Sequence, residues 1–137
     1  MRIASITCFF LVASVAHAAD VIPQYLVGVW ATSDAVFRGE ALFEGQGLYL
    51  DTDGVGAVIG GPPPIGVRIE ATYNPDTKVI AFQMTEYGKV GRKGTYTYDP
   101  ARKLVIIGDG VALHRRFDHV SPSIRQSLGL EPKSRGA

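Results

Sequence analysis

The sequence predicts an all-β protein in which an antiparallel, up-and-down meander closes into a small barrel of about eight strands, with one short C-terminal helix. Apolar residues recur at every second position through most of the chain, and Gly, Pro, Asn and Asp interrupt this pattern at short intervals. Helix signals are nearly absent before Ser121. A meander of this length tends to close on itself, because closure removes the two open edges of the sheet.

The expected strands follow one another with short turns between them. Asp51-Thr52-Asp53-Gly54 predicts a hairpin, and Asn74-Pro75-Asp76-Thr77 and Asp99-Pro100-Ala101-Arg102 predict two further turns. Residues 88–94 are basic and rich in glycine, and we expect a turn there as well. The expected strands span residues 26–32, 47–51, 55–59, 65–73, 78–86, 95–98, 104–107 and 111–119.

The C-terminal helix is indicated by its two ends. Ser121 is a good N-cap with Pro122 at the first helical position, and Gly129 is a plausible stop. Ile124 and Leu128 are four residues apart, which places both on the face that would anchor the helix.

The N-terminus predicts export. Residues 1–18 have a positive start at Arg2, an apolar stretch and a small-x-small cleavage signal at Ala16-His17-Ala18, as in a secretory signal peptide. The apolar stretch is shorter than the roughly 20 residues that span a bilayer. We therefore expect a periplasmic or secreted protein that is cleaved after Ala18, with a single barrel domain at residues 19–130 and a flexible tail at 131–137. The only cysteine, Cys8, leaves with the signal peptide, so the mature chain has no disulfide.

A short motif adds a family resemblance. Gly28-Val29-Trp30 resembles the Gly-x-Trp signature on the first strand of lipocalins and the wider calycin group. The resemblance implies that Trp30 packs across a closed barrel end and that an Arg from the last strand, here Arg115 or Arg116, lies over it as a cation–π pair. It also implies a ligand in the bore. The chain is shorter than a typical lipocalin, which implies a narrower bore.

The first functional hypothesis is a carrier without enzymatic activity that binds a small apolar ligand inside the barrel. Alternation places Tyr96 and Tyr98 on one face. If that face points inward, these tyrosines line or fill the bore; if it points outward, they form an aromatic strip at an interface. The residues expected to line one cavity are Phe82, Met84, Tyr96, Tyr98 and Phe117.

The alternative hypothesis is an interaction module, such as an inhibitor, an immunity protein or an envelope-assembly protein. The segment Gly60-Gly61-Pro62-Pro63-Pro64 is either a stiff loop that presents a surface to another exported protein or a crossover that caps one barrel mouth. Two turns were expected to meet in one positive rim around Arg92, Lys93, Arg102 and Lys103. The whole chain carries 14 basic and 13 acidic residues, so nothing favours a nucleic-acid partner. The sequence does not indicate an oligomeric state.

Catalytic and metal-binding patterns are weak. The segment from Asp51 to Gly54 resembles the start of a calcium loop, but Pro62 stands at the twelfth position, where such a loop needs a bidentate Glu. His114 and His119 point to opposite faces of the last expected strand and cannot share a metal. No nucleophile has an evident partner base. The sequence therefore predicts a protein that is not an enzyme and has no cofactor and no metal.

Overall fold

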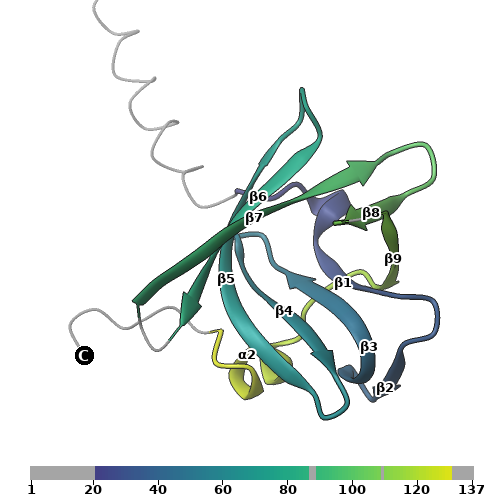
Figure 1. Cartoon of the computed structure of the whole chain (residues 1–137), viewed down its shortest axis with the longest axis vertical. Helices are drawn as coiled ribbons and strands as arrows, with labels where there is room; N and C mark the ends of the chain where they lie inside the picture. The colour runs from purple at the N-terminus through teal and green to yellow at the C-terminus, as the bar shows by residue number, and fades with distance from the viewer. Residues whose placement is uncertain (1–20, 87–88, 109, 131–137) are drawn as a thin grey trace, which may run out of the picture.

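The computed structural model describes residues 21–86, 89–108 and 110–130 (Figure 1). The expected signal peptide at 1–18 and the expected tail at 131–137 lie outside the described residues. No helix in the described part of the chain is long and apolar enough to cross a membrane.

The described strands form a meander that closes into an eight-stranded antiparallel barrel, which confirms the predicted fold class. The ring runs in the order β1-β9-β8-β7-β6-β5-β4-β3, and β3 pairs back onto β1 to complete it. The ring strands are β1 (Gly28–Ala31), β3 (Ala41–Leu50), β4 (Val55–Gly61), β5 (Ile65–Asn74), β6 (Val79–Glu86), β7 (Lys89–Asp99), β8 (Leu104–Ile107) and β9 (Val111–Phe117).

Two features depart from the expected strand pattern at glycine-containing segments. Strand β2 (Val36–Arg38) was not expected, and it pairs with the first half of β3, which begins at Ala41 rather than at residue 47. Gly39 and Gly45 have φ of +63° and +102°, so the chain turns and twists at these positions. Apolar and polar residues do not alternate regularly there, and the sequence pattern therefore does not indicate the strands.

The basic segment expected as a turn is instead the first half of β7. Val90 pairs with Thr85, and Gly94 pairs with Phe82. The Phe82 ring lies over Gly94, where a Cβ would come within 2.6 Å of its Cζ atom. Gly94 thus marks the close approach of an aromatic ring to a strand rather than a loop.

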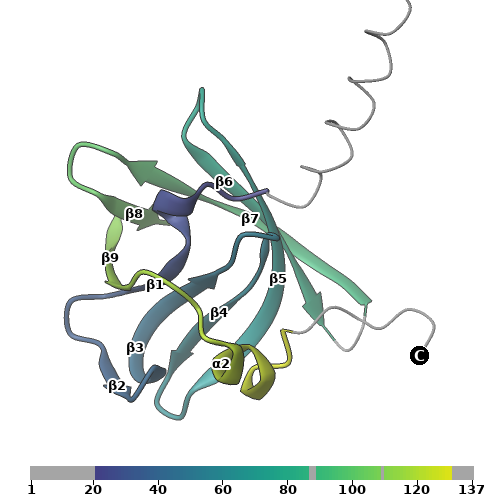
Figure 2. The ribbon, with the colours of Figure 1, turned by 180° about the vertical axis from the view of Figure 1, so that it is seen from behind.

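Apolar side chains form two clusters, one inside the barrel and one on its outer surface. The inner cluster contains Trp30, Leu48, Ile69, Ile80 and Tyr98. The outer cluster is covered by α2 (Pro122–Ser127), whose Ile124 packs with Val29, Tyr49 and Ala57 (Figure 2). The Ser121 hydroxyl accepts a hydrogen bond from the Ile124 amide at 3.3 Å, and Gly129 has φ of +70°, which confirms both predicted helix ends.

The two ends of the barrel differ. The 3₁₀ turn η2 (Gln24–Leu26) lies before β1, and Leu26 is fully buried in the inner cluster, so we call this the closed end. In an up-and-down meander, alternate turns lie at the same end. The β3–β4, β5–β6 and β7–β8 turns therefore lie at the closed end. The β4–β5, β6–β7 and β8–β9 turns lie at the other end, which we call the mouth.

Candidate ligand site at the mouth of the barrel

The closed end is built around Trp30. The indole Nε1 donates a hydrogen bond to the Leu26 carbonyl at 3.0 Å, and the side chain is only 1% exposed. The Arg115 guanidinium carbon lies 5.8 Å from the ring centroid. Arg115 also donates to the Val27 carbonyl and, at 2.9 Å, to the Gln24 carbonyl. Arg115 thus ties β9, β1 and η2 together across this end.

Gly28 allows β1 to enter this arrangement. Its φ of +139° suits glycine, and a Cβ there would come within 2.1 Å of the Phe117 carbonyl oxygen. The second candidate arginine, Arg116, lies elsewhere: its guanidinium carbon is 4.9 Å from the Phe37 ring centroid, and it donates to the Thr32 carbonyl at 3.2 Å. Of the two expected arginines, only Arg115 reaches Trp30.

Tyrosine rings fill the remaining space at the closed end. Tyr98 lies 6.1 Å from the Trp30 ring, 5.7 Å from that of Tyr25 and 6.4 Å from that of Tyr73, measured between centroids. Burial, with smaller contributions from Tyr25 and Tyr98, raises the pKa of Tyr73 to about 12. The Tyr73 hydroxyl therefore stays protonated in the physiological range. Tyr98 is 7% exposed, so its side chain is part of the packed closed end.

The mouth has an apolar pocket with a volume of about 580 Å³. Val58, Tyr96 and Ile107 are partly buried against the inner cluster, and Leu113 belongs to it. Burial raises the pKa of the Tyr96 hydroxyl. The pocket is lined by Gly45, Gln46, Gly47, Val58, Ile59, Gly60, Gly61, Ile65, Val67, Tyr96, Ile107 and Leu113.

The five residues expected to line one cavity do not all meet. Phe82, Met84, Tyr96 and Tyr98 pack in or against the inner cluster, as alternation indicated. Of these four, Tyr96 lines the mouth pocket, and the Phe82 ring supports it from 4.8 Å between centroids. The apolar lining at Val58, Val67, Ile107 and Leu113 was not nominated, although the period-two pattern places these residues on the same inward faces.

Phe117 corrects the expectation of a shared cavity. It packs against the outer cluster, edge-on to Phe37 at 5.4 Å between ring centroids. The β1–β9 register shifts between Val29 and Trp30, so that Trp30 faces Arg115 whereas Val29 faces Phe117. One extra residue in β9 reverses the alternation, and Phe117 points out of the barrel.

The residues expected at a partner surface fall into two groups. Pro62, Pro63 and Pro64 form the exposed β4–β5 turn at the mouth, so this segment is a hairpin tip and not a crossover. Arg92 and Lys93 lie in the mouth half of β7, whereas Arg102 and Lys103 lie in the β7–β8 turn at the closed end. The expectation of one basic rim is therefore wrong. The 11-residue strand β7 separates the two pairs of cations, since Arg92 and Lys93 lie near its start and Arg102 and Lys103 follow its end.

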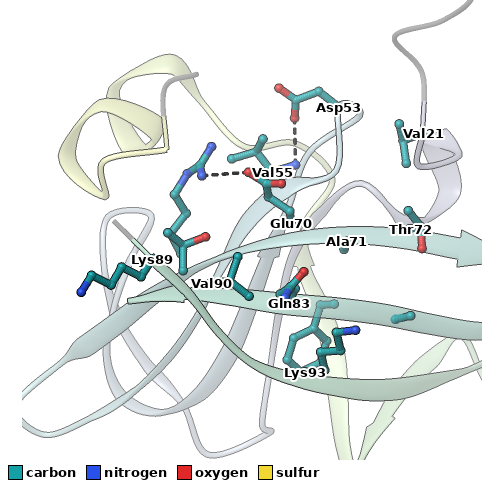
Figure 3. A pocket seen from close by; sticks show the side chains of 14 residues that line it. Val21, Asp53, Val55, Glu70, Ala71, Thr72, Gln83, Lys89, Val90 and Lys93 are labelled. Carbon is teal, nitrogen blue, oxygen red and sulfur yellow. Dashed lines mark hydrogen bonds and ion pairs between the residues drawn. The ribbon is translucent and has the colours of Figure 1, made fainter. Parts of the chain in front are cut away.

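A larger depression of about 890 Å³ lies on the outer surface (Figure 3). Charged residues of both signs line it, including Arg68, Glu70 and Lys93. Arg68 donates to Glu70 at 3.0 Å. Its charged walls on the outside of the barrel make this groove a poorer candidate for an apolar ligand than the mouth.

Asp51 and Asp53 bind an arginine in this structure. Arg125 of α2 donates to Asp51 at 2.8 Å and to Asp53 at 3.3 Å. Burial opposes the charge on Arg125, but these hydrogen bonds raise its pKa overall. The described residues contain no group of three or more His, Cys, Asp or Glu side chains placed to hold a metal ion.

His119 lies 3.0 Å from Asp118 and 3.5 Å from Glu40.

Comparisons with protein-family models, curated proteins and solved structures found no match for this chain.

Proposed function

We propose that this protein is an exported, lipocalin-like barrel that binds a small, mostly apolar ligand at its mouth and carries out no catalysis. The observation that carries the proposal is the 580 Å³ pocket formed by residues of six barrel strands. Ligand pockets of about 300–1,000 Å³ with apolar walls are typical of small-molecule sites. Export rests on the signal-peptide pattern at residues 1–18.

The closed end supports the lipocalin likeness. Gly28-Val29-Trp30 carries the short signature, and the Arg115 guanidinium stacks on Trp30 from the last strand. A helix follows that strand, as it does in the family. A rigid, filled end of this kind would hold the strands that form the pocket at the other end.

The pocket lining indicates the chemistry of the ligand. Val58, Val67, Ile107 and Leu113 offer only aliphatic surface, whereas Tyr96 and Gln46 offer polar groups at the same site. We therefore expect an apolar ligand with one or two hydrogen-bonding groups, since a few placed polar contacts usually fix the orientation of such a ligand.

Native mass spectrometry of the mature protein, purified gently from its host envelope, tests this function. The expected result is an extra mass on the order of a few hundred daltons, which is the size of one drug-like ligand. A Val67→Trp variant would fill the mouth and reduce occupancy about tenfold or more. Val36→Trp is the matched control, because Val36 is exposed on β2 and does not line the pocket.

The alternative function is partner binding through the Pro62–Pro64 turn and the cations near it. Its support is that this turn and Arg92 and Lys93 lie at the same end of the barrel. A protein mass without any small ligand, or one increased by a second polypeptide, would favour this alternative and contradict the carrier proposal.

A further inference from the structure

Strand β7 has a free edge along its mouth half. Residues 89–97 pair with β6 on one side, but β8 pairs only with Tyr96–Asp99 on the other. In the part of the chain that the structure describes, no strand covers residues 89–95 on the β8 side. Figure 1 shows this half of β7 extending away from β8. A strand edge of this kind presents backbone N–H and C=O groups that are ready to pair with another strand.

The side chains on this edge are cationic and exposed. Lys89, Arg92 and Lys93 are all exposed, and none forms an ion pair within the described residues. Residues 89–95 contain no acidic residue. Val90 is 76% exposed, so the edge also offers an apolar contact.

The neighbouring groove leaves these positive charges uncompensated. Lys89 and Lys93 line one wall of the outer groove (Figure 3). The acidic residues of the groove, Glu70 and Asp53, bind Arg68 and Arg125 respectively. An acidic ligand at the β7 edge would therefore meet cations that Glu70 and Asp53 do not bind.

We propose that the free edge of β7 binds an extended acidic segment of another exported protein, which adds as one more antiparallel strand. Backbone hydrogen bonds would supply affinity, and the three cations would select acidic side chains. The free stretch is as long as a common strand, and β6 holds it in strand conformation before binding. This inference does not depend on the ligand pocket.

The same charges argue against a second copy of this chain. Pairing β7 with β7 of another copy would bring two sets of Lys89, Arg92 and Lys93 together, and like charges on neighbouring strands are unfavourable. Lysine on an edge strand is a known protection against such self-association. The cations thus disfavour pairing with a second copy of this chain and favour pairing with an acidic segment.

The test uses the mature protein and a synthetic peptide in which Glu and Asp alternate with Val and Thr over the length of the free edge. Fluorescence anisotropy measures its binding, and amide hydrogen exchange reports on residues 89–95. We expect binding with protection of these amides. The triple variant Lys89→Glu, Arg92→Glu, Lys93→Glu should weaken binding about tenfold or more. The matched control is Lys78→Glu, Arg102→Glu, Lys103→Glu, which removes the same charge at the closed end and should leave binding unchanged.

A second pair of peptides separates strand addition from simple charge attraction without altering the protein. Backbone N-methylation at alternate residues removes the N–H groups from one peptide edge or from the other. Methylation of one edge should weaken binding, and methylation of the opposite edge should not. Equal binding of both methylated peptides, no binding of the parent peptide, or equal loss in both triple variants would overturn the proposal. Binding that persists in Val67→Trp would show that this site is separate from the mouth pocket.

Discussion

The closed end and the mouth of the barrel are built from the same strands but packed in opposite ways. At the closed end Leu26, Trp30 and Tyr98 are at most 7% exposed, and η2 covers them. At the mouth Val58, Tyr96 and Ile107 are only partly buried, and Ile65 is 67% exposed. One end therefore supplies the densely packed core, and the other end holds the pocket in which we propose that a ligand binds.

The closed end is also where polar groups tie the elements together. Trp30 donates a hydrogen bond to the Leu26 carbonyl, and Arg115 donates to the carbonyls of Val27 and Gln24. Side chains from β1 and β9 therefore hold the backbone of η2 and of Val27, which follows it. The described residues contain no cysteine, so no disulfide supplements the core that they form. A small domain without such a crosslink depends on dense packing, and the closed end is where that packing is concentrated.

The largest expected effect comes from removing the centre of the closed end. Trp30→Ala should lower the free energy of unfolding by about 3–5 kcal/mol, because it deletes a fully buried aromatic side chain and leaves a cavity. Tyr96→Ala at the mouth should cost less, about 2 kcal/mol, because that side chain is only partly buried. Urea unfolding followed by circular dichroism measures both. Equal losses would contradict the division between the two ends.

Alanine substitutions at two glycines of β4 compare the two ends directly, and we expect their effect on stability to be of intermediate size. Gly56 lies opposite Leu50 and Ile69 toward the closed end, and a Cβ there would come within 1.9 Å of the Tyr49 carbonyl oxygen. Gly60 lies at the mouth, and the nearest atom to its Cβ would be 3.9 Å away.

Gly56→Ala should therefore destabilise the fold by about 3 kcal/mol, because the backbone must move, whereas Gly60→Ala should change stability by no more than about 0.5 kcal/mol. Thermal unfolding of the two variants side by side makes the comparison. A large loss in Gly60→Ala would mean that the mouth is as tightly packed as the closed end.

The smallest expected effect concerns the turn between β2 and β3, where Glu40 contacts His119. His119 contacts Asp118 and Glu40, and its hydrogen bond to Asp118, with further help from Glu40, raises the pKa of the imidazole above its ordinary value of 6.5. A raised pKa means that the contribution to stability is fully present below about pH 6.5 and is lost as the pH rises through the raised value.

His119→Gln should therefore melt slightly below the wild-type protein at about pH 5.5 and together with it at about pH 8.5, since only the protonated imidazole gains from the two carboxylates. Differential scanning calorimetry at both pH values, with Glu40→Gln as a second variant, is the measurement. A difference that grows with pH would show that the sign is wrong.

Local chemistry predicted much of this molecule. The turns at Asp51 to Gly54 and at Asn74 to Thr77 and the N-cap Ser121 all depend on neighbours within a few residues. The elements that the sequence did not predict depend on residues that are distant in the chain. Residues 89–94 form a strand because β6 pairs with them, and Gly94 is explained by the Phe82 ring across that pair.

The candidate site shows the same limit. The carrier hypothesis placed Tyr96 and Phe117 in one cavity, but the bulge between β1 and β9 turned Phe117 outward. A bulge is a property of two strands that are far apart in the chain. The alternation of apolar and polar residues within one strand therefore cannot predict the bulge.

By itself the sequence determined an antiparallel barrel and its helix caps, because period-two patterning and turn chemistry are local. The Gly-x-Trp resemblance implied that Trp30 packs across the closed end. Only the tertiary structure decided that Arg115 rather than Arg116 covers Trp30. It placed the cations of β7 and those of the β7–β8 turn at opposite ends of the barrel. It also decided that the free space of the bore lies at the mouth. These outcomes depend on strand register and on the summed volume of side chains that meet across the barrel, and neither quantity belongs to any single stretch of sequence.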